Sequence, residues 1–435
     1  MYQMKNIGPI KDVQLELNKL TLIFGRNNSG KTCAVNSVYC YHRFLHGKIA
    51  DGVVEYFVDN NRDGLLRIEN EALLSIISGI VENYDASFLD ILAEKNRFFV
   101  DMKSIFCKKK TAVCAKEKAA EGTLVAESND GVKCECAIDP KGIEVRCEGG
   151  EIDKEVCSAL IGSAVGFVLA GHASRPVMVS AERAGISLFY KDINSLLRIV
   201  EQRSKDGTCT LDGQDVVNAI KSNMLLYNAA VDDNINFMKA SVEIKHKRKG
   251  SRDFLSVVLS DIDQLLEGAL RSDGKEVYAE FGGKKVGIGS CSSSFRSLAL
   301  LRQYLELTVV PSGLVIVDEP EISLHPEYQR RLARILVALA NAGVSVIVTT
   351  HSDYIMREMN ISMALNNPGD DVAKIRKKYG YREDQTISYK DVSIYEFDGG
   401  VSTPVPVGKN GASIEAMDSV IRNMMSIYSD IECLG

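Results

Sequence analysis

A loop near the N-terminus has the residues needed to hold the phosphates of a nucleotide. Its members are Gly25, Arg26, Asn27, Asn28, Ser29, Gly30, Lys31 and Thr32. The glycines let backbone amides approach phosphate oxygens, and a helix that follows presents its N-terminus to the anion. Lys31 is expected to reach the β- and γ-phosphates, and the Thr32 hydroxyl to ligate Mg²⁺. The loop therefore predicts binding of ATP or GTP.

The flanking segments favour this interpretation over an ordinary glycine-rich turn. Leu20–Phe24 is a short apolar run that predicts a buried parallel strand directly before the loop. An amphipathic helix is predicted over Cys33–Leu45. A strand, a glycine-rich loop and a helix in this order are what a phosphate cradle requires.

A pair of carboxylates far along the chain could complete the site. Leu314–Val317 is a continuous apolar run that predicts a central parallel strand, and Asp318 follows at its carboxyl end. Ligands bind at that end of the strands in α/β sheets, so Asp318 is expected in the Mg²⁺ shell. Glu319 is then placed to orient and polarise the attacking water. The alternative is a structural acid pair at a helix start.

A histidine lies beyond another predicted core strand. Val344–Val348 is apolar and is followed by Thr349-Thr350-His351. A helix is predicted over Gln329–Ala340, between the two strands. His351 is therefore expected at the same sheet edge as Asp318, where an imidazole could sense a γ-phosphate. A lone histidine without this position would be incidental.

Three serines precede a predicted helix that carries Leu298, Leu301 and Leu305. These residues, Ser292, Ser293 and Ser294, could simply cap the helix. They could also place hydroxyls and free amides at a positive helix end, where they would hold the γ-phosphate of a second subunit. The pattern alone leaves both interpretations open, the helix cap and the contact with a partner's nucleotide.

Composition limits the class of protein. The chain has 435 residues, of which 45% are hydrophobic and 25% charged, a balance typical of a globular protein with two or three domains. It shows neither a signal peptide nor an apolar run of about 20 residues, which predicts a cytoplasmic protein without a membrane span. The net charge of -6 argues against a wholly basic nucleic-acid surface.

One local run could still bind nucleic acid. Its basic residues are Lys245, Lys247, Arg248, Lys249 and Arg252. Such a run can grip phosphates, but a solvated loop between helices is the more common structure.

The 11 cysteines are an odd, scattered set, which argues against a disulfide framework. Cys134 and Cys136 alternate with polar residues and precede an Asp139–Gly142 turn. This pattern predicts a hairpin in which cysteine is a small apolar residue, with a metal site as the alternative.

The order of these segments predicts an α/β P-loop fold with three parts. Residues 1–180 form the first half of the nucleotide-binding core and include a β-rich lobe at about 65–170. Residues 186–272 have helical spacing and are interpreted as a helical insertion. Residues 273–435 complete the core, with a hairpin at Val277–Phe281 and Lys285–Ile288 before the serines.

The whole motif order resembles ABC-type ATPases of the SMC, RecF and OLD branch. The elements that carry the resemblance are the phosphate loop, the serine-led helix, Leu314-Val-Ile-Val-Asp-Glu-Pro-Glu-Ile-Ser-Leu-His-Pro326 and Thr349-Thr-His-Ser-Asp353. More narrowly, Val179–Ile186 and Val392–Phe397 resemble elements of the stand-alone AAA-family ATPases of prokaryotic defence loci. The resemblance covers about residues 1–45, 176–190 and 255–430.

This resemblance implies an ATP-dependent homodimer or larger homo-oligomer in which each site is completed by the partner's serine signature. ATP and Mg²⁺ are the implied cofactors, and Lys31, Glu319 and His351 the implied catalytic residues. Ser294 stands where most relatives have glycine. The segment Leu324–Pro326 would couple the two sites. Glu182 and Arg183 occupy the place where a Q-loop glutamine is expected.

The resemblance also indicates what the chain lacks. OLD-type nucleases carry an acidic nuclease module, whereas the residues after His351 are interpreted as a linker, a hairpin at about Val392–Val407 and a closing helix at about Ser413–Tyr428. A separate effector is therefore implied, as in the PARIS and Septu anti-phage systems. The alternative is a RecF-like DNA-repair ATPase. A transporter subunit is disfavoured by the Leu-His-Pro element.

Overall fold

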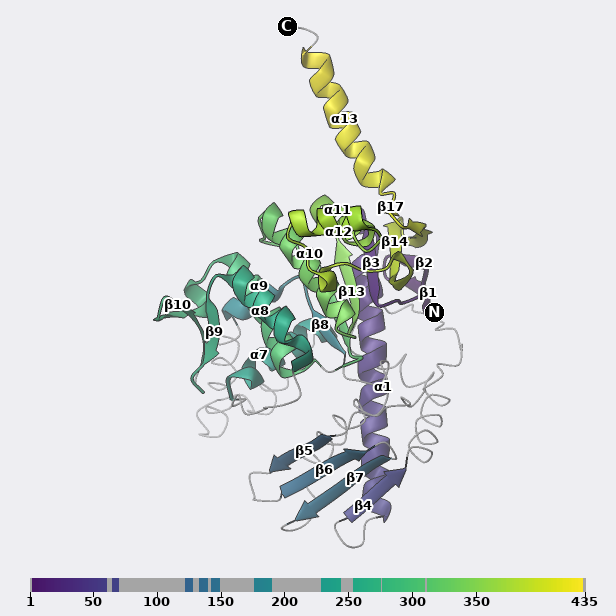
Figure 1. Cartoon of the computed structure of the whole chain (residues 1–435). Coiled ribbons are helices and arrows are strands. Elements are labelled where there is room, and N and C mark those ends of the chain that lie inside the picture. Colours follow the sequence, from purple (N-terminus) through teal and green to yellow (C-terminus); the bar gives the residue numbers. More distant parts are fainter. Residues whose placement is uncertain are drawn as a thin grey trace, which may run out of the picture.

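A mixed eight-stranded sheet forms the centre of the structure (Figure 1), a computed structural model that describes residues 2–60, 65–69, 122–127, 133–139, 142–148, 176–189, 228–243, 253–274, 276–309 and 311–432. Its strand order is β1-β2-β15-β14-β3-β13-β12-β8. The strands are β1 (Tyr2–Ile7), β2 (Ile10–Leu15), β3 (Leu20–Gly25), β8 (Val177–Val179), β12 (Leu314–Asp318), β13 (Ser345–Thr350), β14 (Val392–Asp398) and β15 (Val401–Val405).

The five strands from β14 to β8 are parallel. β12 is buried along its whole length and β3 along all of it except Gly25, as expected for parallel strands covered on both faces. The register pairs Thr350 with Phe24 and Asp318 with Thr349. The carboxyl ends of β3, β13 and β12 therefore meet at one edge. This arrangement confirms the expected α/β P-loop fold.

Two antiparallel hairpins widen the sheet. β1 and β2 form the first around a bend in which Asn6 and Gly8 have positive φ angles of 56° and 52°. β14 and β15 form the second, which confirms the predicted C-terminal hairpin. The two hairpins meet where Val401 pairs with Asp12.

Helices cover both faces of the sheet. They are α1 (Lys31–Asn60), α7 (Ala229–Glu243), α8 (Ser256–Leu266), α9 (Ser293–Leu307), α10 (Pro326–Asn341) and α11 (Asp353–Ala364). Two further helices do not cover the sheet: α12 (Asp370–Lys378) has no buried residue, and α13 (Glu415–Glu432) is largely exposed and extends away from the sheet (Figure 1). Short 3-10 turns lie at Asp253–Leu255 (η1), Ile288–Ser290 (η2), Glu383–Gln385 (η3) and Tyr389–Asp391 (η4). Alternate strand residues point to opposite faces, so Leu22 packs with α8 to α11 and Ile23 packs with α1.

Buried carboxylates join the helices to one another. The Asp233 carboxylate of α7 accepts hydrogen bonds from Tyr39 at 2.5 Å and from Arg43 at 3.0 Å, both on α1. Glu358 of α11 is fully buried and bonds Arg330 at 2.6 Å and Arg334 at 2.5 Å, both on α10. Charges removed from water need such partners. The two contacts fix α7 and α11 against the helices next to the sheet.

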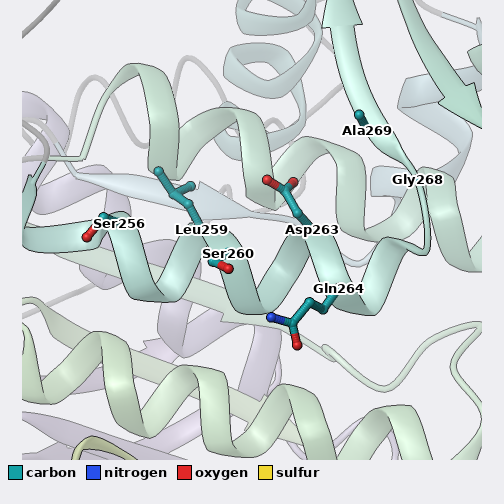
Figure 2. A pocket seen from close by; sticks show the side chains of 7 residues that line it. All are labelled: Ser256, Leu259, Ser260, Asp263, Gln264, Gly268 and Ala269. Carbon is teal, nitrogen blue, oxygen red and sulfur yellow. The ribbon is translucent and has the colours of Figure 1, made fainter. Parts of the chain in front are cut away.

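Small sheets lie beside the central one. β9 (Ala269–Ser272), β10 (Val277–Phe281) and β11 (Lys284–Gly287) form a three-stranded sheet that includes the hairpin predicted from the sequence. β16 (Val407–Gly408) and β17 (Gly411–Ala412) form a short ribbon. An open cavity of about 540 Å³ lies along α8 and the start of β9 (Figure 2). Its lining residues are Ser256, Leu259, Ser260, Asp263, Gln264, Gly268 and Ala269.

The β-rich lobe has four antiparallel strands in the described residues. They are β4 (Leu65–Glu69), β5 (Gly122–Glu127), β6 (Lys133–Asp139) and β7 (Gly142–Glu148), in the order β4-β7-β6-β5. The predicted hairpin is confirmed, with Asp139 paired to Gly142. The sequence of the lobe also predicts helices at about 72–80, 86–92 and 154–169, which lie outside the described residues. Residues 190–227 of the expected helical insertion lie outside them as well.

Three expectations from the sequence were wrong. The helix after the phosphate loop continues to Asn60, well beyond Leu45. The segment after His351, interpreted as a linker, contains α11 and α12, and α11 buries Ile355, Met356, Met359 and Met363 at helical spacing. Ala269–Ser272, assigned to the helical insertion, is strand β9, because pairing with β10 outweighs the local pattern.

None of the helices in the described part of the chain has both the length and the apolar character needed to cross a bilayer.

The contact between Gly25 and β14 generates a stability prediction. A Cβ atom at Gly25 would lie 2.1 Å from the Phe397 carbonyl oxygen, and Gly25 has a φ angle of +141°. We expect Gly25→Ala to lower the free energy of unfolding by about 2–3 kcal/mol, measured by chemical denaturation. The matched control is Gly185→Ala, which lies in a helical segment with open space around the added atom and should raise stability by about 0.5–1 kcal/mol. Equal effects of the two substitutions would contradict the steric origin of the loss.

Candidate nucleotide-binding site

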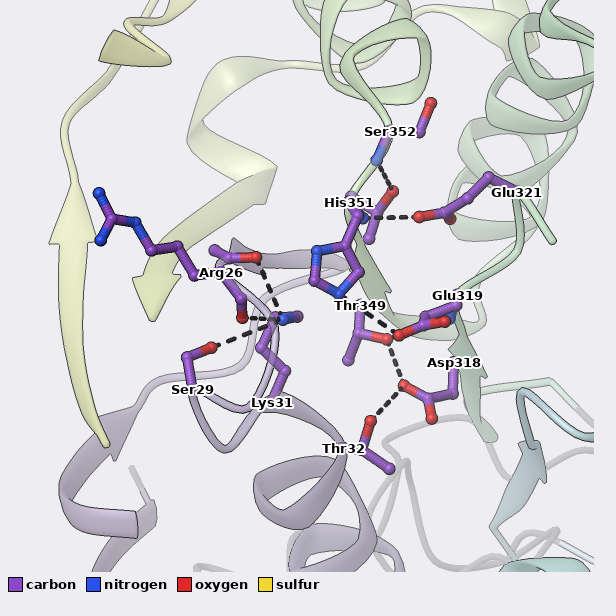
Figure 3. Close-up of polar contacts among 12 residues, drawn as sticks. Arg26, Ser29, Lys31, Thr32, Asp318, Glu319, Glu321, Thr349, His351 and Ser352 are labelled. Atoms are coloured by element: carbon purple, nitrogen blue, oxygen red, sulfur yellow. Dashed lines mark hydrogen bonds and ion pairs between the residues drawn. The ribbon is translucent and has the colours of Figure 1, made fainter. Parts of the chain in front are cut away.

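The predicted site residues from the two ends of the chain meet at the carboxyl edge of β3, β13 and β12 (Figure 3). The phosphate loop follows β3, Asp318 ends β12, and His351 follows β13. Parallel pairing of the three strands produces this proximity, because it aligns their carboxyl ends. The site is thus assembled by the sheet register.

The phosphate loop has the backbone shape that its glycines allow. Gly25 and Gly30 have φ angles of +141° and +99°, and Asn28 adopts +58°. An added Cβ at Gly30 would lie 3.2 Å from the Ile10 side chain. Arg26, Asn27 and Asn28 are exposed at the turn of the loop. This loop can therefore present main-chain amides to an anion.

The Lys31 ammonium lies inside the loop. Its Nζ atom donates to the carbonyl oxygens of Gly25 at 3.1 Å and Arg26 at 2.7 Å, and it lies 3.5 Å from Ser29 Oγ. Burial lowers the pKa of Lys31, and the nearby carboxylates of Glu319, Asp318 and Glu321 oppose that shift. A positive group is thus held where phosphate oxygens would lie over the loop.

Asp318 links the loop to the second strand. Its Oδ1 atom accepts hydrogen bonds from Thr32 Oγ1 at 3.3 Å and from the Thr349 hydroxyl. Burial raises the pKa of Asp318 to about 6, while the hydrogen bonds from Thr349 and Thr32 act in the opposite direction. A carboxylate and a hydroxyl are hard oxygen ligands of the type that Mg²⁺ prefers. Thr32 and Asp318 therefore fit a Mg²⁺ ion.

Glu319 and His351 lie side by side at the open part of the site. Their side chains approach to 3.4 Å between Oε1 and Nε2, and both are partly exposed, at 28% and 31%. Glu319 has a positive φ angle of 47°, which is uncommon for a residue with a side chain. Its N–H donates to the Thr349 carbonyl oxygen at 3.1 Å and to the Thr349 hydroxyl at 3.1 Å. The geometry places a carboxylate and an imidazole where a water molecule and a terminal phosphate could be contacted.

Two residues of the site were not assigned from the sequence. Glu321 Oε1 accepts from the His351 backbone N–H at 2.6 Å, and its buried Oε2 has no hydrogen-bond partner in the described structure. Thr349 contacts both Asp318 and Glu319. A signal existed for each, since Glu321 follows Glu319 by two residues and Thr349 precedes His351 by two.

Arg183, which had no assigned role, is almost fully buried at 2% exposure. Its guanidinium donates to the carbonyl oxygens of Asp318 and Glu319. Burial lowers the pKa of Arg183 to about 10, against the effect of Glu321, Asp318 and Glu319, so that the group is cationic at neutral pH. It contributes positive charge behind the two carboxylates. Glu182 is exposed.

Ser292 caps α9, and Ser293 and Ser294 are the first two residues of the helix. Ser292 is the N-cap residue, and its Oγ accepts from the Phe295 N–H at 3.1 Å and lies 2.9 Å from Ser294 Oγ. Ser293 is exposed. Among the described residues, no hydrogen bond joins these serines to the phosphate loop of the same chain. The capping role is observed, and contact with a partner's nucleotide stays a prediction.

Two further predicted segments have different outcomes. His325 of the Leu-His-Pro element is the N-cap of α10 and accepts from Glu327 N–H at 3.4 Å. The basic run at 245–252 lies outside the described residues, so its expected contact with nucleic acid is not tested.

Comparison with protein families gives one match. Residues 226–357 match the family described as "AAA domain, putative AbiEii toxin, Type IV TA system". The matched segment includes the serines, Asp318, Glu319 and His351, but not the phosphate loop, and it spans less than half of the chain. Together with the sheet topology, it supports a P-loop ATPase fold of the AAA type.

Several solved structures are similar. A Pyrococcus furiosus Smc head domain with an extended coiled coil, bound to the C-terminal domain of ScpA, is 14% identical, with 99% of this chain and 98% of that chain covered and a TM-score of 0.33. The SMC head domain from Thermotoga maritima is 12% identical, with 94% and 98% covered and a TM-score of 0.32. An SmcHead bound to the C-winged helix domain of ScpA is 13% identical, with 96% and 98% covered and a TM-score of 0.33.

The position of Lys31 predicts the effect of its removal. We expect Lys31→Ala to weaken ATP binding by about 2 kcal/mol, or roughly 30-fold, because the phosphates lose a charged donor. Isothermal titration calorimetry with ATP and Mg²⁺ measures this loss. The control is Lys19→Ala, since Lys19 is exposed and pairs with Asp391 at 2.7 Å, away from the loop. Unchanged affinity in Lys31→Ala would exclude this loop as the phosphate site.

Proposed function

We propose that this chain binds and hydrolyses ATP with Mg²⁺, and that ATP-dependent association of two or more copies controls a separate effector in an anti-phage defence system. The observation that carries the ATPase assignment is the cluster of Lys31, Thr32, Asp318, Glu319 and His351 at one sheet edge. Lys31 and Thr32 begin α1 directly after the loop that follows β3, Asp318 and Glu319 lie at the end of β12, and His351 follows β13.

Each residue would contribute to the reaction in a distinct way. Lys31 would hold phosphate oxygens through its ammonium. Thr32 and Asp318 would hold Mg²⁺, which neutralises developing negative charge when bound. Glu319 would accept a hydrogen bond from the attacking water and orient it, and His351 would contact the terminal phosphate. The partial exposure of Glu319 and His351 suits groups that must reach solvent and substrate.

Association through the ATP sites is supported by the start of α9. Ser292 and Ser293 are exposed at the N-terminus of a 15-residue helix, where the helix dipole favours an anion. A second copy of the chain could bring its bound nucleotide to this end. Each site would then need residues from both copies.

The defence context is supported by the description of the matching family, which names a toxin of a type IV toxin–antitoxin system. The matched segment holds the carboxylates and the serines but does not by itself identify an effector. The RecF-like alternative depends on the basic run at 245–252, and no observation on the described residues favours it.

The assignment of Glu319 predicts the behaviour of Glu319→Gln. We expect turnover to fall by at least about 100-fold, because an amide cannot accept the proton or orient the water as a carboxylate does. ATP should still bind, so the nucleotide-bound dimer should accumulate and retain the effector. Phosphate release and size-exclusion chromatography with ATP measure these effects. Glu280→Gln on β10 is the control, and normal turnover in Glu319→Gln would remove Glu319 from the reaction.

Completion of each site by a partner can be tested by mixing two inactive variants. Ser293→Glu keeps the Ser292 cap and adds an acidic residue to the first turn of α9, which suits the helix but repels a phosphate. A mixed dimer of Ser293→Glu and Glu319→Gln contains one site with an intact carboxylate and an intact serine signature. We expect the mixture to recover ATPase activity that neither variant shows alone. A mixture that stays inactive although mixed dimers form would contradict sharing of the site.

A further inference from the structure

The contacts of Arg183 join two parts of the molecule that the reaction would have to coordinate. Nη1 donates to the Asp318 carbonyl oxygen at 2.9 Å and to the Ser180 carbonyl oxygen at 3.3 Å. Nη2 donates to the Glu319 carbonyl oxygen at 2.8 Å, and Nε donates to Ser297 Oγ at 2.7 Å. One side chain therefore connects the end of β8, the end of β12 and helix α9.

The cost of burying this group indicates a specific demand for it. All four hydrogen bonds are made to uncharged oxygens, so within the described contacts the cation is buried without a bonded carboxylate. Burial of a charge is expensive, and the nearby carboxylates of Glu321, Asp318 and Glu319 favour the cation without bonding it. The guanidinium serves three backbone carbonyl groups and one hydroxyl at once, which an apolar side chain could not do.

The backbone conformation of Glu319 indicates what Arg183 holds in place. Its φ angle of 47° lies in the left-handed region, where a residue with a Cβ atom is strained. The N–H side of the residue is held by Thr349, and the C=O side is held by Arg183. Because both peptide groups are fixed, the Glu319 side chain is directed toward His351.

Ser297 extends this connection into α9. It is fully buried, lies one helical turn after the exposed serines, and accepts from Arg183 while donating to the Ile322 carbonyl oxygen at 3.3 Å. A shift of the start of α9 would therefore act on Arg183 directly. Through Arg183 it would reach the carbonyl group of Glu319.

We propose that Arg183 is a positioning residue that holds Glu319 in its left-handed conformation and couples it to α9, so that a partner's nucleotide at the α9 serines adjusts hydrolysis in the same chain's own site. This inference rests on the proposed ATPase function and deepens it. It adds a connection within one chain. This connection runs from the start of α9, which would contact the partner, to the Glu319 carboxylate, which would orient the water.

The test compares Arg183→Gln and Arg183→Lys with Arg302→Gln. Arg302 is the matched control, because it is a shielded arginine on α9 that pairs with Asp263 at 2.8 Å, away from Glu319. We expect Arg183→Gln to lower kcat by about 100-fold while the Kd for ATP changes by less than about 3-fold, as for residues that orient a catalytic group. Arg183→Lys should recover part of the loss, since an ammonium can bond one of the carbonyl groups. Arg302→Gln should retain both values.

Ser297→Ala tests the connection to α9 with a smaller change. If Ser297 acts through Arg183, a double variant that carries both Arg183→Gln and Ser297→Ala should hydrolyse ATP no more slowly than Arg183→Gln alone. If the fold-losses in turnover of Arg183→Gln and Ser297→Ala multiply in the double variant, the two residues act independently and the proposed coupling is overturned. If the Arg183 variants do not fold, normal turnover in Ser297→Ala would overturn it as well, and reduced turnover with unchanged ATP affinity would support it.

The two levels of the proposal fail in different ways. An unaltered chain that neither binds nor hydrolyses ATP contradicts the proposed function. Normal hydrolysis that persists in Arg183→Gln contradicts only the positioning by Arg183. A parallel loss of ATP affinity and melting temperature in Arg183→Gln would assign the residue to stability alone.

Discussion

The hydrogen-bond register between β12 and β13 is the constraint on which the site depends. It sets Asp318 opposite Thr349, so that the Thr349 hydroxyl reaches the Asp318 carboxylate and the Glu319 N–H. A slip of one residue would turn these side chains to the opposite face of the sheet. The same parallel pairing continues to β3 and brings the phosphate loop to the same edge. The register that apolar packing on both faces of the sheet imposes therefore determines which side chains meet at the carboxyl edge.

Charged side chains are buried at the end of β12. Lys31, Arg183 and Asp318 are each at most 5% exposed, and they lie within reach of one another's fields at the end of β12. The attraction of Lys31 and Arg183 to Asp318 offsets part of the desolvation cost that each group would carry alone. Glu319 and His351 remain partly exposed. The buried charged residues thus lie beneath a carboxylate and an imidazole that are more accessible. This arrangement suits a site that must hold phosphate and also admit water.

Much of the core could be predicted because its signals are local. The apolar runs that became β3, β12 and β13 are too short for helices and end in polar residues, and the glycine spacing of the phosphate loop is required by few structures besides an anion cradle. The helices after His351 were missed although α11 has clear helical spacing, since the segment was interpreted from its position after the last motif. Strand β9 was missed because four residues carry too little periodicity, and its partner β10 decides its structure.

The sequence by itself determined the phosphate loop, the carboxylate pair and the histidine, because each depends on residue types within a few positions of a strand end. Only the tertiary structure decided what Arg183, Glu321 and Thr349 do. Arg183 contacts residues more than one hundred positions away, and its partners are mostly backbone carbonyl groups, which have the same chemistry in every sequence. Contacts of that kind leave no local pattern. They exist because the folded sheet and α9 bring together Glu319, whose backbone is in the left-handed region, the buried Ser297 and Arg183.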